Sequence, residues 1–501
     1  MVTSNCKSDE KSISNPSNKR ARTCLSFEDR ISNLPDKLIV EHILPLLITF
    51  DAIQTSVLSK RWHYLWAKVP HLDFVKYGGE FDHEVSDYLY SDVGVIEYKD
   101  EKEEEVEYKK KWGFACYCVK LYTGAMRLHQ SRKLISFKLG FDYSQEHESF
   151  VSNSVRYAIT RKVETLHLLF HGMPKLGFPS GNIDNESFSW ELCMLPQHLY
   201  ANTNSIVNIQ FDCCHVSPRC TVSWSCMMNL YIHNTFISED AIKKILMGSP
   251  RLTNVEFGDC KGFSAIDTCY SSSLRTLGVN GFSKGGPDML NIYVSNHLET
   301  LILTGNFLFT KCRLMNTSSS LKKVELIFRA VPRQGEGDED MYKEYGVILM
   351  ELLAKLHGVS SLRVGNWCIK VLSMMKMKNV TSPYSYCNSL VLDTLLTDLE
   401  LPGVISMLEN SQHLKQLFVR SSKISNAQLQ LVPYFNNTFN FGGRFDQSSS
   451  NQKLKQSLKN LKKVKILDSR TRRYNDECVS SFTCFLLSHT ISPVKITIRK
   501  A

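Results

Sequence analysis

Long hydrophobic runs are missing from this sequence. None of its 501 residues belongs to a stretch of eighteen consecutive apolar residues, and the longest run, HILPLLITF, has roughly nine and contains Pro45. A membrane-spanning helix needs about 20. The first twenty residues also lack the apolar stretch of a secretory signal. We therefore expect a protein of the nucleus or cytoplasm that has no membrane partner.

Metal-binding cysteine pairs are missing too. The chain has 16 cysteines but no Cys-x-x-Cys pair; Cys116 and Cys118 are too close for a zinc knuckle, and Cys213 and Cys214 are adjacent. In a reducing compartment such thiols stay free, and most are expected to be small buried hydrophobes. The sequence therefore predicts no metal site.

Catalytic motifs are absent as well. The sequence contains no Gly-x-Gly-x-x-Gly, no Walker lysine loop, no His-Glu-x-x-His and no Gly-x-Ser-x-Gly. The neighbours Cys213, Cys214 and His215 suggest a thiol nucleophile at first sight, but a base must meet its nucleophile in space, and adjacency along the chain does not establish that. We expect a protein without catalytic residues or a cofactor, and not an enzyme.

Charge is unevenly distributed. The net charge is +10, and residues 451–501 alone hold twelve Lys or Arg against three Asp or Glu, a balance of +9. Aromatic residues are not interleaved with these basic ones, which favours a solvated basic face over a nucleic-acid site.

Several polar segments have little to bury. Residues 1–27 are predicted to be a disordered tail, in which NKRAR (Asn18–Arg22) matches a short nuclear-import signal. Residues 97–111 and 333–344 are predicted to be solvated loop or helix, and residues 436–452 a polar loop.

Residues 28–74 form a dense apolar segment with helical spacing. Pro35 suits a first helical turn, Asp51 is a candidate N-cap for a second helix over AIQTSVLS, and KRWHYLWAKV suggests a third. The predicted apolar face of the first helix consists of Leu38, Ile39, His42, Ile43, Leu46 and Leu47. A unit this small gains stability by packing on something else.

An internal repeat organises the middle of the chain. The template L-x-x-L-x-L-x-x-N/C, with any aliphatic residue or Phe at the L positions, recurs with its fourth position at residues 209, 230, 255, 277, 301 and 324, so that successive steps are 21, 25, 22, 24 and 23 residues. Later steps of 38, 28, 27 and 47 residues indicate insertions. These lengths are typical of leucine-rich repeats.

The physics of the template predicts a solenoid. The alternating L-x-L forms a short strand with two side chains in the core, and the residue between them points outward on the concave face. The terminal Asn or Cys turns the chain and can hydrogen-bond neighbouring backbone. ISEDAIKKILMGSPRL is predicted to return along the convex side as a helix, capped by Ser238 and ended by Gly248 and Pro250, with an apolar face of Ala241, Ile242, Ile245 and Leu246.

Residues 29–74 resemble the F-box of plant F-box/leucine-rich-repeat proteins. The matching elements are Asp29-Arg30-Ile31-Ser32, Leu34-Pro35-Asp36, His42-Ile43-Leu44, Asp51-Ala52, Ser56-Val57-Leu58-Ser59-Lys60-Arg61-Trp62 and Leu65-Trp66. Residues 458–467 and 485–498 loosely resemble the FBD-type C-terminal segment of that family. The resemblance implies an α/β fold: a small all-helical F-box at 28–74, a solenoid at 75–435, the loop at 436–452 and a basic FBD-like segment at 453–501.

Two departures from the family pattern stand out. The chain has one residue more between Leu34 and His42, and Ile48-Thr49-Phe50 replaces the usual Pro-Thr-Lys before Asp-Ala. One extra residue rotates a helical face by about 100 degrees. The register of Leu34 and Pro35 against the later helix thus becomes a structural question.

The resemblance implies a binding function. F-box modules dock on an SKP-family adaptor, and through it on a cullin, of an SCF-type ubiquitin ligase, while the repeats hold a protein substrate. The residues implied to form or support the adaptor interface are Leu34, Pro35, Ile43, Leu44, Val57, Leu58, Trp62, Leu65 and Trp66. The outward strand residues expected to face substrate are Asn229, Tyr231, His233, Glu256, Ile302, Glu325, Arg363 and Phe418. The alternative is a repeat scaffold that binds protein or nucleic acid without a ligase.

Overall fold

The computed structural model describes most of the chain. The described residues are 31, 33–76, 101–172, 191–201, 203–282, 286–307, 311–316, 319–329, 339–356, 358–380, 382–383, 386–394, 396–397, 400–421, 450–468, 476–491 and 493–500. The predicted tail at 1–27 lies outside them, as do residues 97–100, 333–338 and 436–449 of the predicted polar insertions.

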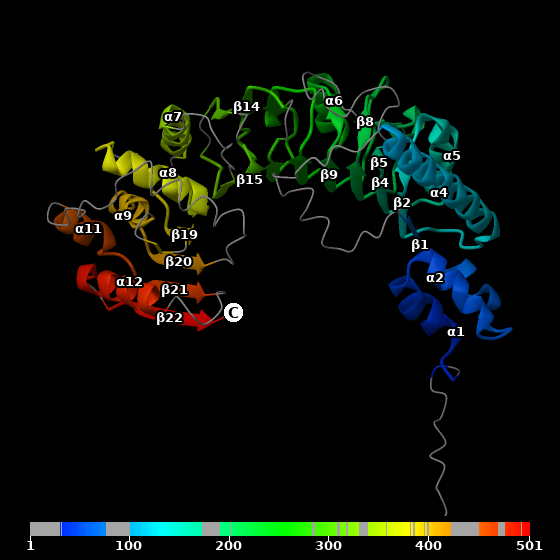
Figure 1. Ribbon diagram of the computed structural model, residues 1–501, viewed down its shortest axis with the longest axis horizontal. Coiled ribbons are helices and arrows are strands. Elements are labelled where there is room, and N and C mark those ends of the chain that lie inside the picture. Colours follow the sequence, from blue (N-terminus) through cyan, green and yellow to red (C-terminus); the bar gives the residue numbers. More distant parts are fainter. Residues whose placement is uncertain are drawn as a thin grey trace, which may run out of the picture.

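A single parallel sheet runs through the described structure and follows the inner side of an arch (Figure 1). It has 14 strands in chain order, each paired in parallel with the next. The strands are β1 (His71–Val75), β2 (Ser136–Gly140), β4 (Thr165–Leu169), β7 (Asn208–Asp212), β9 (Asn229–His233), β11 (Asn254–Gly258), β13 (Thr276–Asn280), β15 (Thr300–Asn306), β17 (Lys323–Arg329), β18 (Ser361–Val364), β19 (Ser389–Asp393), β20 (Gln416–Ser421), β21 (Lys463–Asp468) and β22 (Lys495–Lys500). The predicted α/β solenoid is confirmed.

The register of the sheet matches the predicted repeat. Leu230 of β9 pairs with Ile209 on one side and Val255 on the other, and the row continues through Leu277 and Leu301. All of these side chains are buried. The template therefore placed every strand of the large sheet from β7 to β17 correctly, because its alternating apolar pair is what fills the solenoid core.

The residue after each central strand reverses the chain in the left-handed region. Cys213, Asn234, Asp259 and Gly281 follow β7, β9, β11 and β13 with φ of 51°, 47°, 49° and 63°. Gly, Asn and Asp tolerate this region best. The prediction that the template Cys itself turns the chain is wrong, since the left-handed residues Cys213 and Asp259 precede Cys214 and Cys260. The predicted hydrogen bond to neighbouring backbone is confirmed at Cys260, whose thiol donates to the carbonyl of Ile232 at 3.2 Å.

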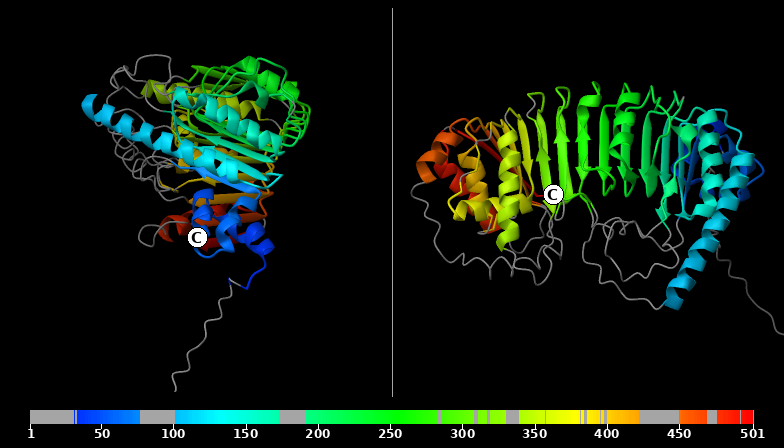
Figure 2. Two further views of the ribbon diagram at one scale, coloured as in Figure 1. Left: turned by 90° about the vertical axis from the view of Figure 1, so that its right-hand side faces the viewer. Right: turned by 90° about the horizontal axis from the view of Figure 1, so that it is seen from above.

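The convex side differs along the arch, as Figure 2 shows. Short strands cover its middle, in three small sheets. They are β3 (Asp142–Tyr143) with β5 (His171–Gly172); β6 (Cys193–Met194), β8 (Cys214–Val216) and β10 (Phe236–Ile237); and β12 (Ala265–Asp267), β14 (Met289–Tyr293) and β16 (Lys311–Leu314). Helices cover the remainder: α4 (Glu101–Leu128), α5 (Glu148–Thr160), α6 (Glu239–Gly248), α7 (Glu339–Lys355), α8 (Asn366–Met377), α9 (Leu401–Glu409), α11 (Ser450–Leu458) and α12 (Asp476–His489).

Helix α6 confirms the predicted return segment. The hydroxyl of Ser238 accepts a hydrogen bond from the backbone N–H of Ala241 at 3.2 Å, and the helix ends at Gly248. Its four predicted apolar residues are buried. The polar insertions at 97–111 and 333–344 enter α4 and α7, whereas Ser450–Gln452 at the end of the predicted loop begin α11.

The N-terminal helical unit (residues 33–70) consists of short helical segments. They are α1 (Asp36–Leu38), a π-helical turn (Ile39–Ile43), α2 (Thr49–Gln54) and 3-10 turns at Leu44–Leu46, Thr55–Val57, Trp62–Tyr64 and Trp66–Lys68. The prediction of Asp51 as an N-cap is wrong: α2 begins two residues earlier, so that Asp51 lies in its first turn. A carboxylate there still favours the positive end of the helix dipole.

The helical unit is joined rigidly to the solenoid. Its chain passes directly into β1, so the boundary expected at residue 74 falls inside the first strand of the sheet. The hydroxyl of Thr49 accepts a hydrogen bond from the N–H of Asp73 at 2.7 Å. Phe74 of β1 stacks on Tyr122 of α4 with ring centroids 4.8 Å apart. The orientation of the unit is therefore set by packing and hydrogen bonds, not by a linker.

His129 braces the same junction through both of its ring nitrogens. One ring nitrogen lies 2.8 Å from the carbonyl of Val69 and the other 2.8 Å from the hydroxyl of Tyr157, an arrangement that suits a neutral ring. Burial, with the charge of Arg161, lowers the pKa of His129 despite the bond to Val69.

We expect acid to weaken this junction. Below the ordinary histidine pKa of about 6.5 the unfolded chain binds a proton that the folded chain does not, so stability is complete above this pH and is lost as the pH falls below it. His129→Gln should flatten the fall by up to about 1.4 kcal/mol per pH unit, measured by urea unfolding at pH 7.5, 6.5 and 5.5. Parallel curves for wild type and variant would refute a role of His129.

Candidate functional site

Large apolar side chains are exposed on the helical unit. Val57 is 87% exposed, Leu46 83% and Leu58 65%, and Leu38 and Tyr64 are exposed as well. We call these five residues the apolar patch. Exposed apolar side chains on so small a unit make it a candidate surface for a partner.

The nine residues predicted for the adaptor interface divide into two groups. Val57, Leu58 and Pro35 are exposed, and Leu34 and Ile43 are half-buried against the core. Leu44, Trp62, Leu65 and Trp66 are buried; the two indole rings are only 6% and 5% exposed. These four side chains therefore belong to the core of the helical unit and not to its surface.

The π-turn explains how the extra residue is accommodated. Its defining bond runs from the N–H of Leu44 to the carbonyl of Ile39, five residues back, and such a turn holds one residue more than an α-helical turn. The turn lies in the stretch where the family pattern is one residue shorter. It also explains why the predicted apolar face is wrong in part: Ile39 is buried and Ile43 half-buried, whereas the other four members are exposed. These four are Leu38, His42, Leu46 and Leu47.

Arg61 fastens the beginning of the unit to its end. Its guanidinium donates to the Asp36 carboxylate at 2.7 Å and to the carbonyl of Leu34. This fork places Leu34 and Pro35 beside the segment that carries Val57 and Leu58. The register of Leu34 and Pro35 is thus fixed by an ion pair that links two of the motifs quoted above.

Because the strands pair in register, equivalent outward residues of successive strands line up in rows across the concave face. The central row runs, in register, through Tyr231, Glu256, Gly278, Ile302 and Glu325. It continues through Arg363, Val391 and Phe418. The predicted substrate residues at the middle of a strand all lie in this central row: Tyr231, Glu256, Ile302, Glu325, Arg363 and Phe418. Asn229 and His233 flank the row at the two ends of β9.

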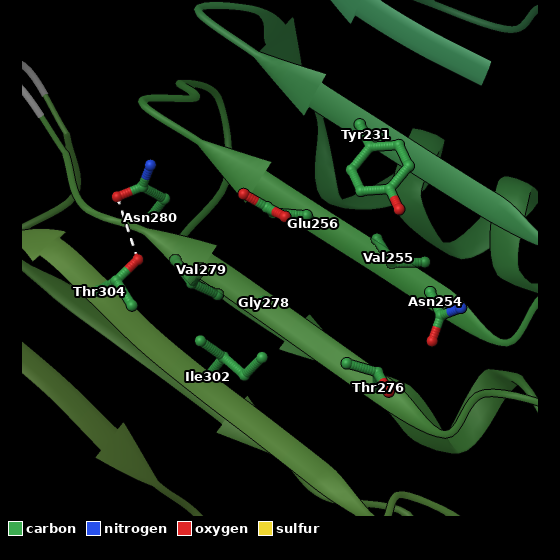
Figure 3. Close-up of a pocket in the computed structure, with 10 residues that line it drawn as sticks. All are labelled: Tyr231, Asn254, Val255, Glu256, Thr276, Gly278, Val279, Asn280, Ile302 and Thr304. Atoms are coloured by element: carbon green, nitrogen blue, oxygen red, sulfur yellow. Dashed lines mark hydrogen bonds between the residues drawn. The ribbon is translucent and has the colours of Figure 1, made fainter. Parts of the chain in front are cut away.

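A depression of about 280 Å³ lies in the middle of this face (Figure 3). Gly278 forms its floor, because it is the one residue of the central row without a side chain, and Tyr231, Glu256 and Ile302 surround it. A Cβ atom at Gly278 would lie 3.2 Å from the Cγ of Glu256, tighter than ordinary contact. The glycine therefore opens a space that almost any other residue would fill.

Other predicted substrate residues are already engaged inside the sheet. Asn229 donates from its amide to Asn208 and accepts from Asn254, both at 2.6 Å, within a ladder that crosses neighbouring strands. Glu325 pairs with Arg363 at 3.0 Å, and Arg363 pairs with Asp393 at 2.8 Å. The atoms that these side chains would offer to a ligand are largely used for strand-to-strand contacts.

Arg363 holds two carboxylates that would otherwise repel each other. Burial opposes ionisation of Glu325, but the hydrogen bond and charge of Lys323, together with Arg363, outweigh it and lower the pKa of Glu325. We expect Arg363→Ala to destabilise the chain by about 2 kcal/mol, because it leaves Asp393 partly buried without its cation and Glu325 with Lys323 alone. Urea unfolding measures this. Arg363→Lys keeps the charge and should lose less; equal losses would show that only the fork geometry matters.

The adjacent thiols do not form a nucleophilic site. Burial, with the neighbouring charge of Asp212, raises the pKa of Cys213 to about 12. Cys214 is fully buried, and His215 lies beside the sulfur of Met194 at 3.0 Å. Among the described residues no group of three or more His, Cys, Asp or Glu could hold a metal ion. No helix in the same part of the chain is long and apolar enough to cross a bilayer.

Sequence reasoning missed two features of these surfaces. Gly278 was overlooked because a search for binding residues looks for side chains, although a glycine at an outward strand position is itself a signal of close approach. Leu46 and Tyr64 were missed as surface residues because periodicity alone assigns apolar residues to the core. Strands β1, β2 and β22 also escaped the template, although β1 and β22 carry the alternation in HLDFV and KITIRK.

Comparison with known proteins gives the same picture. No family model matches the chain. A putative F-box protein of Arabidopsis thaliana is 26% identical over 398 residues, which cover 79% of this chain and 84% of that protein. An F-box/LRR-repeat protein of the same plant is 26% identical over 411 residues, 81% of this chain and 75% of the relative. F-box/LRR-repeat protein 25 is 26% identical over 267 residues, 53% of this chain and 81% of the relative. The fold and this similarity together confirm the predicted resemblance to plant F-box/leucine-rich-repeat proteins.

Proposed function

We propose that this protein is the substrate-recognition subunit of an SCF-type ubiquitin ligase, acting in the nucleus or cytoplasm. The F-box would dock on an SKP-family adaptor, and through it on a cullin, while the concave face holds a protein substrate. Ubiquitin transfer would be carried out by the other subunits of the complex, so that this chain contributes binding and no catalytic residue.

One observation carries the proposal: the apolar patch on the F-box is exposed although the unit already has a core. Val57 and Leu58 are adjacent and exposed to solvent, whereas Trp62 and Leu65 are buried. Exposing them in a free protein is unfavourable, by about 25 cal/mol for each Å² of apolar surface left in water. A partner that covers them recovers that free energy.

The rigid junction favours the same role. A ligase must hold its substrate at a set distance from the machinery that transfers ubiquitin, and a receptor with a loose linker would not. Here Thr49 and His129 tie the F-box to the solenoid. The cation of Lys76 also lies 4.5 Å from the ring centroid of Phe50, one of the residues that departs from the family pattern.

Co-purification tests the proposal. The full chain is co-expressed with a plant SKP-family adaptor, and the complex is examined by size-exclusion chromatography and then with a cullin added. Co-elution in a stable one-to-one complex is the expected result. A chain that folds but elutes alone would contradict the ligase role and leave the scaffold alternative. Deleting residues 28–74 is a poor control, because it also removes most of β1 from the sheet.

A further inference from the structure

The concave face of the last three strands carries charge of one sign. Its outward positions include Arg420 on β20, Lys463 and Lys465 on β21, and Lys495 and Arg499 on β22. We call these five residues the cationic face. Leu467 and Thr497 complete the outward positions of β21 and β22, and Asp393 of β19, the register partner of Arg420, is paired with Arg363.

Elsewhere on the concave face, charges are paired within the sheet. Lys138 meets Asp73 at 2.9 Å near one end of the sheet, and Arg363 bridges Glu325 and Asp393 further along. Within the described structure none of the five cations of the cationic face makes an ion pair; Lys465 instead lies 5.5 Å from the ring centroid of Phe418. Their charge is therefore left for something outside the sheet.

The arrangement also places like charges beside each other. Lys463 and Lys495 are direct partners in the register of β21 and β22. Like charges directly opposite each other destabilise a sheet. Protection of an open sheet edge explains lysine on β22, the last strand, but not the cations on β20 and β21, which are paired on both sides. The repulsion between these like charges destabilises the sheet and no contact among the described residues of the sheet offsets it, which indicates that the cations bind a ligand.

The spacing of the cations suits an extended peptide. Lys463 and Lys465 are two residues apart on one strand, so their side chains leave the sheet about 6.6 Å apart, the same repeat as alternate side chains of an extended chain. The cationic face extends over about 13 Å along β22, from Lys495 to Arg499. A stretch of four or five residues with carboxylates at alternate positions therefore matches it in length and charge.

Nucleic acid fits this face less well. Proteins that hold single strands without sequence preference stack the bases on aromatic rings. Phe418 is the one aromatic residue at the outward positions of β20–β22 among the described residues, and it is half-buried with Lys465 over its ring. The face thus offers charge without a stacking platform.

We propose that the cationic face binds an extended, Asp/Glu-rich segment of the protein substrate. That the bound protein is a ligase substrate rests on the proposed function, whereas the binding of an acidic segment does not. The acidic segment is held by the end of the arch farthest from the F-box along the sheet, which leaves the rest of the concave face, including the depression at Gly278, for other parts of the same protein (Figure 1).

Peptide binding by the purified full chain tests this. The probe is a fluorescein-labelled ten-residue peptide of alternating Glu and Ser, and binding is followed by fluorescence anisotropy against a Gln/Ser peptide. Lys465→Glu with Arg499→Glu should weaken binding of the acidic peptide at least tenfold. The matched control, Lys120→Glu with Arg127→Glu on the exposed side of α4, makes the same change in net charge and should stay within twofold.

The outcomes separate the possible readings. No binding, or equal weakening in both double variants, would overturn the proposal, and circular dichroism shows whether each variant is folded. Tighter binding of a ten-residue oligothymidylate than of the acidic peptide, lost in the same variant, would overturn it in favour of nucleic acid. Adaptor co-purification is measured in parallel: if it fails while peptide binding holds, the ligase role falls and the site stands.

Discussion

Replacing Val57 and Leu58 together by Asp is expected to abolish adaptor binding and to leave the fold intact. Both side chains project into solvent, so the free chain loses little when they become charged. In a complex the two carboxylates would be taken out of water against an apolar surface without a partner. We expect the adaptor affinity to fall at least 100-fold, about 2.7 kcal/mol, by isothermal titration.

A matched pair of substitutions controls for the added charge. Val347 on α7 and Leu487 on α12 are also exposed, and Val347→Asp with Leu487→Asp makes the same chemical change on the convex side, away from the F-box. That variant should bind the adaptor like wild type. If the F-box variant retained its affinity, Val57 and Leu58 would not belong to the interface, and Leu46, Leu38 and Tyr64 would be the next residues to test.

Trp62→Ala is expected to act through folding and not through direct contact. The indole of Trp62 is buried in the F-box, and truncating a buried Trp costs about 3–5 kcal/mol in lost burial and the cavity left behind. That is comparable with the whole stability a small unit can have. The F-box should therefore unfold locally while the solenoid stays folded, since most of the core lies elsewhere.

Hydrogen exchange distinguishes the two roles of this residue. In Trp62→Ala, amides of residues 36–68 should lose protection and those of β9–β15 should keep it, with adaptor binding lost at the same time. Trp62→Phe retains much of the buried surface and should lose less protection. Unchanged exchange combined with lost adaptor binding would instead show that the ring contacts the adaptor directly.

Much of the fold was predictable because the repeat is a local pattern. The buried row from Ile209 to Val324 follows from spacing alone, and the left-handed residue after each strand agrees with Asn, Asp or Gly in three of the four central repeats. Ser238 and Gly248 mark the two ends of α6 in the sequence itself. Each of these signals involves only a few neighbouring residues. Because similar repeats stack along the solenoid, the same local signal predicts the structure of each one.

Residue roles were less predictable, because they depend on what lies across the strands. Glu325 and Arg363 were predicted as ligand-facing residues from their outward position, and that position is correct, yet each neutralises the other across two paired strands. Asn229 is similar, as its amide is used on both sides by a ladder. Alternation along one strand shows which side chains point outward. Whether such a side chain is free to bind a ligand also depends on the residues of the two neighbouring strands.

The sequence by itself determined the order F-box then repeats, the length of each repeat and the identity of the central row. Only the tertiary structure decided that the extra residue near Ile39 becomes a π-turn, that the two tryptophans are buried, and that Gly278 opens a depression. The physical reason is the range of the forces involved. Alternation, caps and turns act between neighbours along the chain, while burial, ion pairing and empty space depend on residues that only folding brings together.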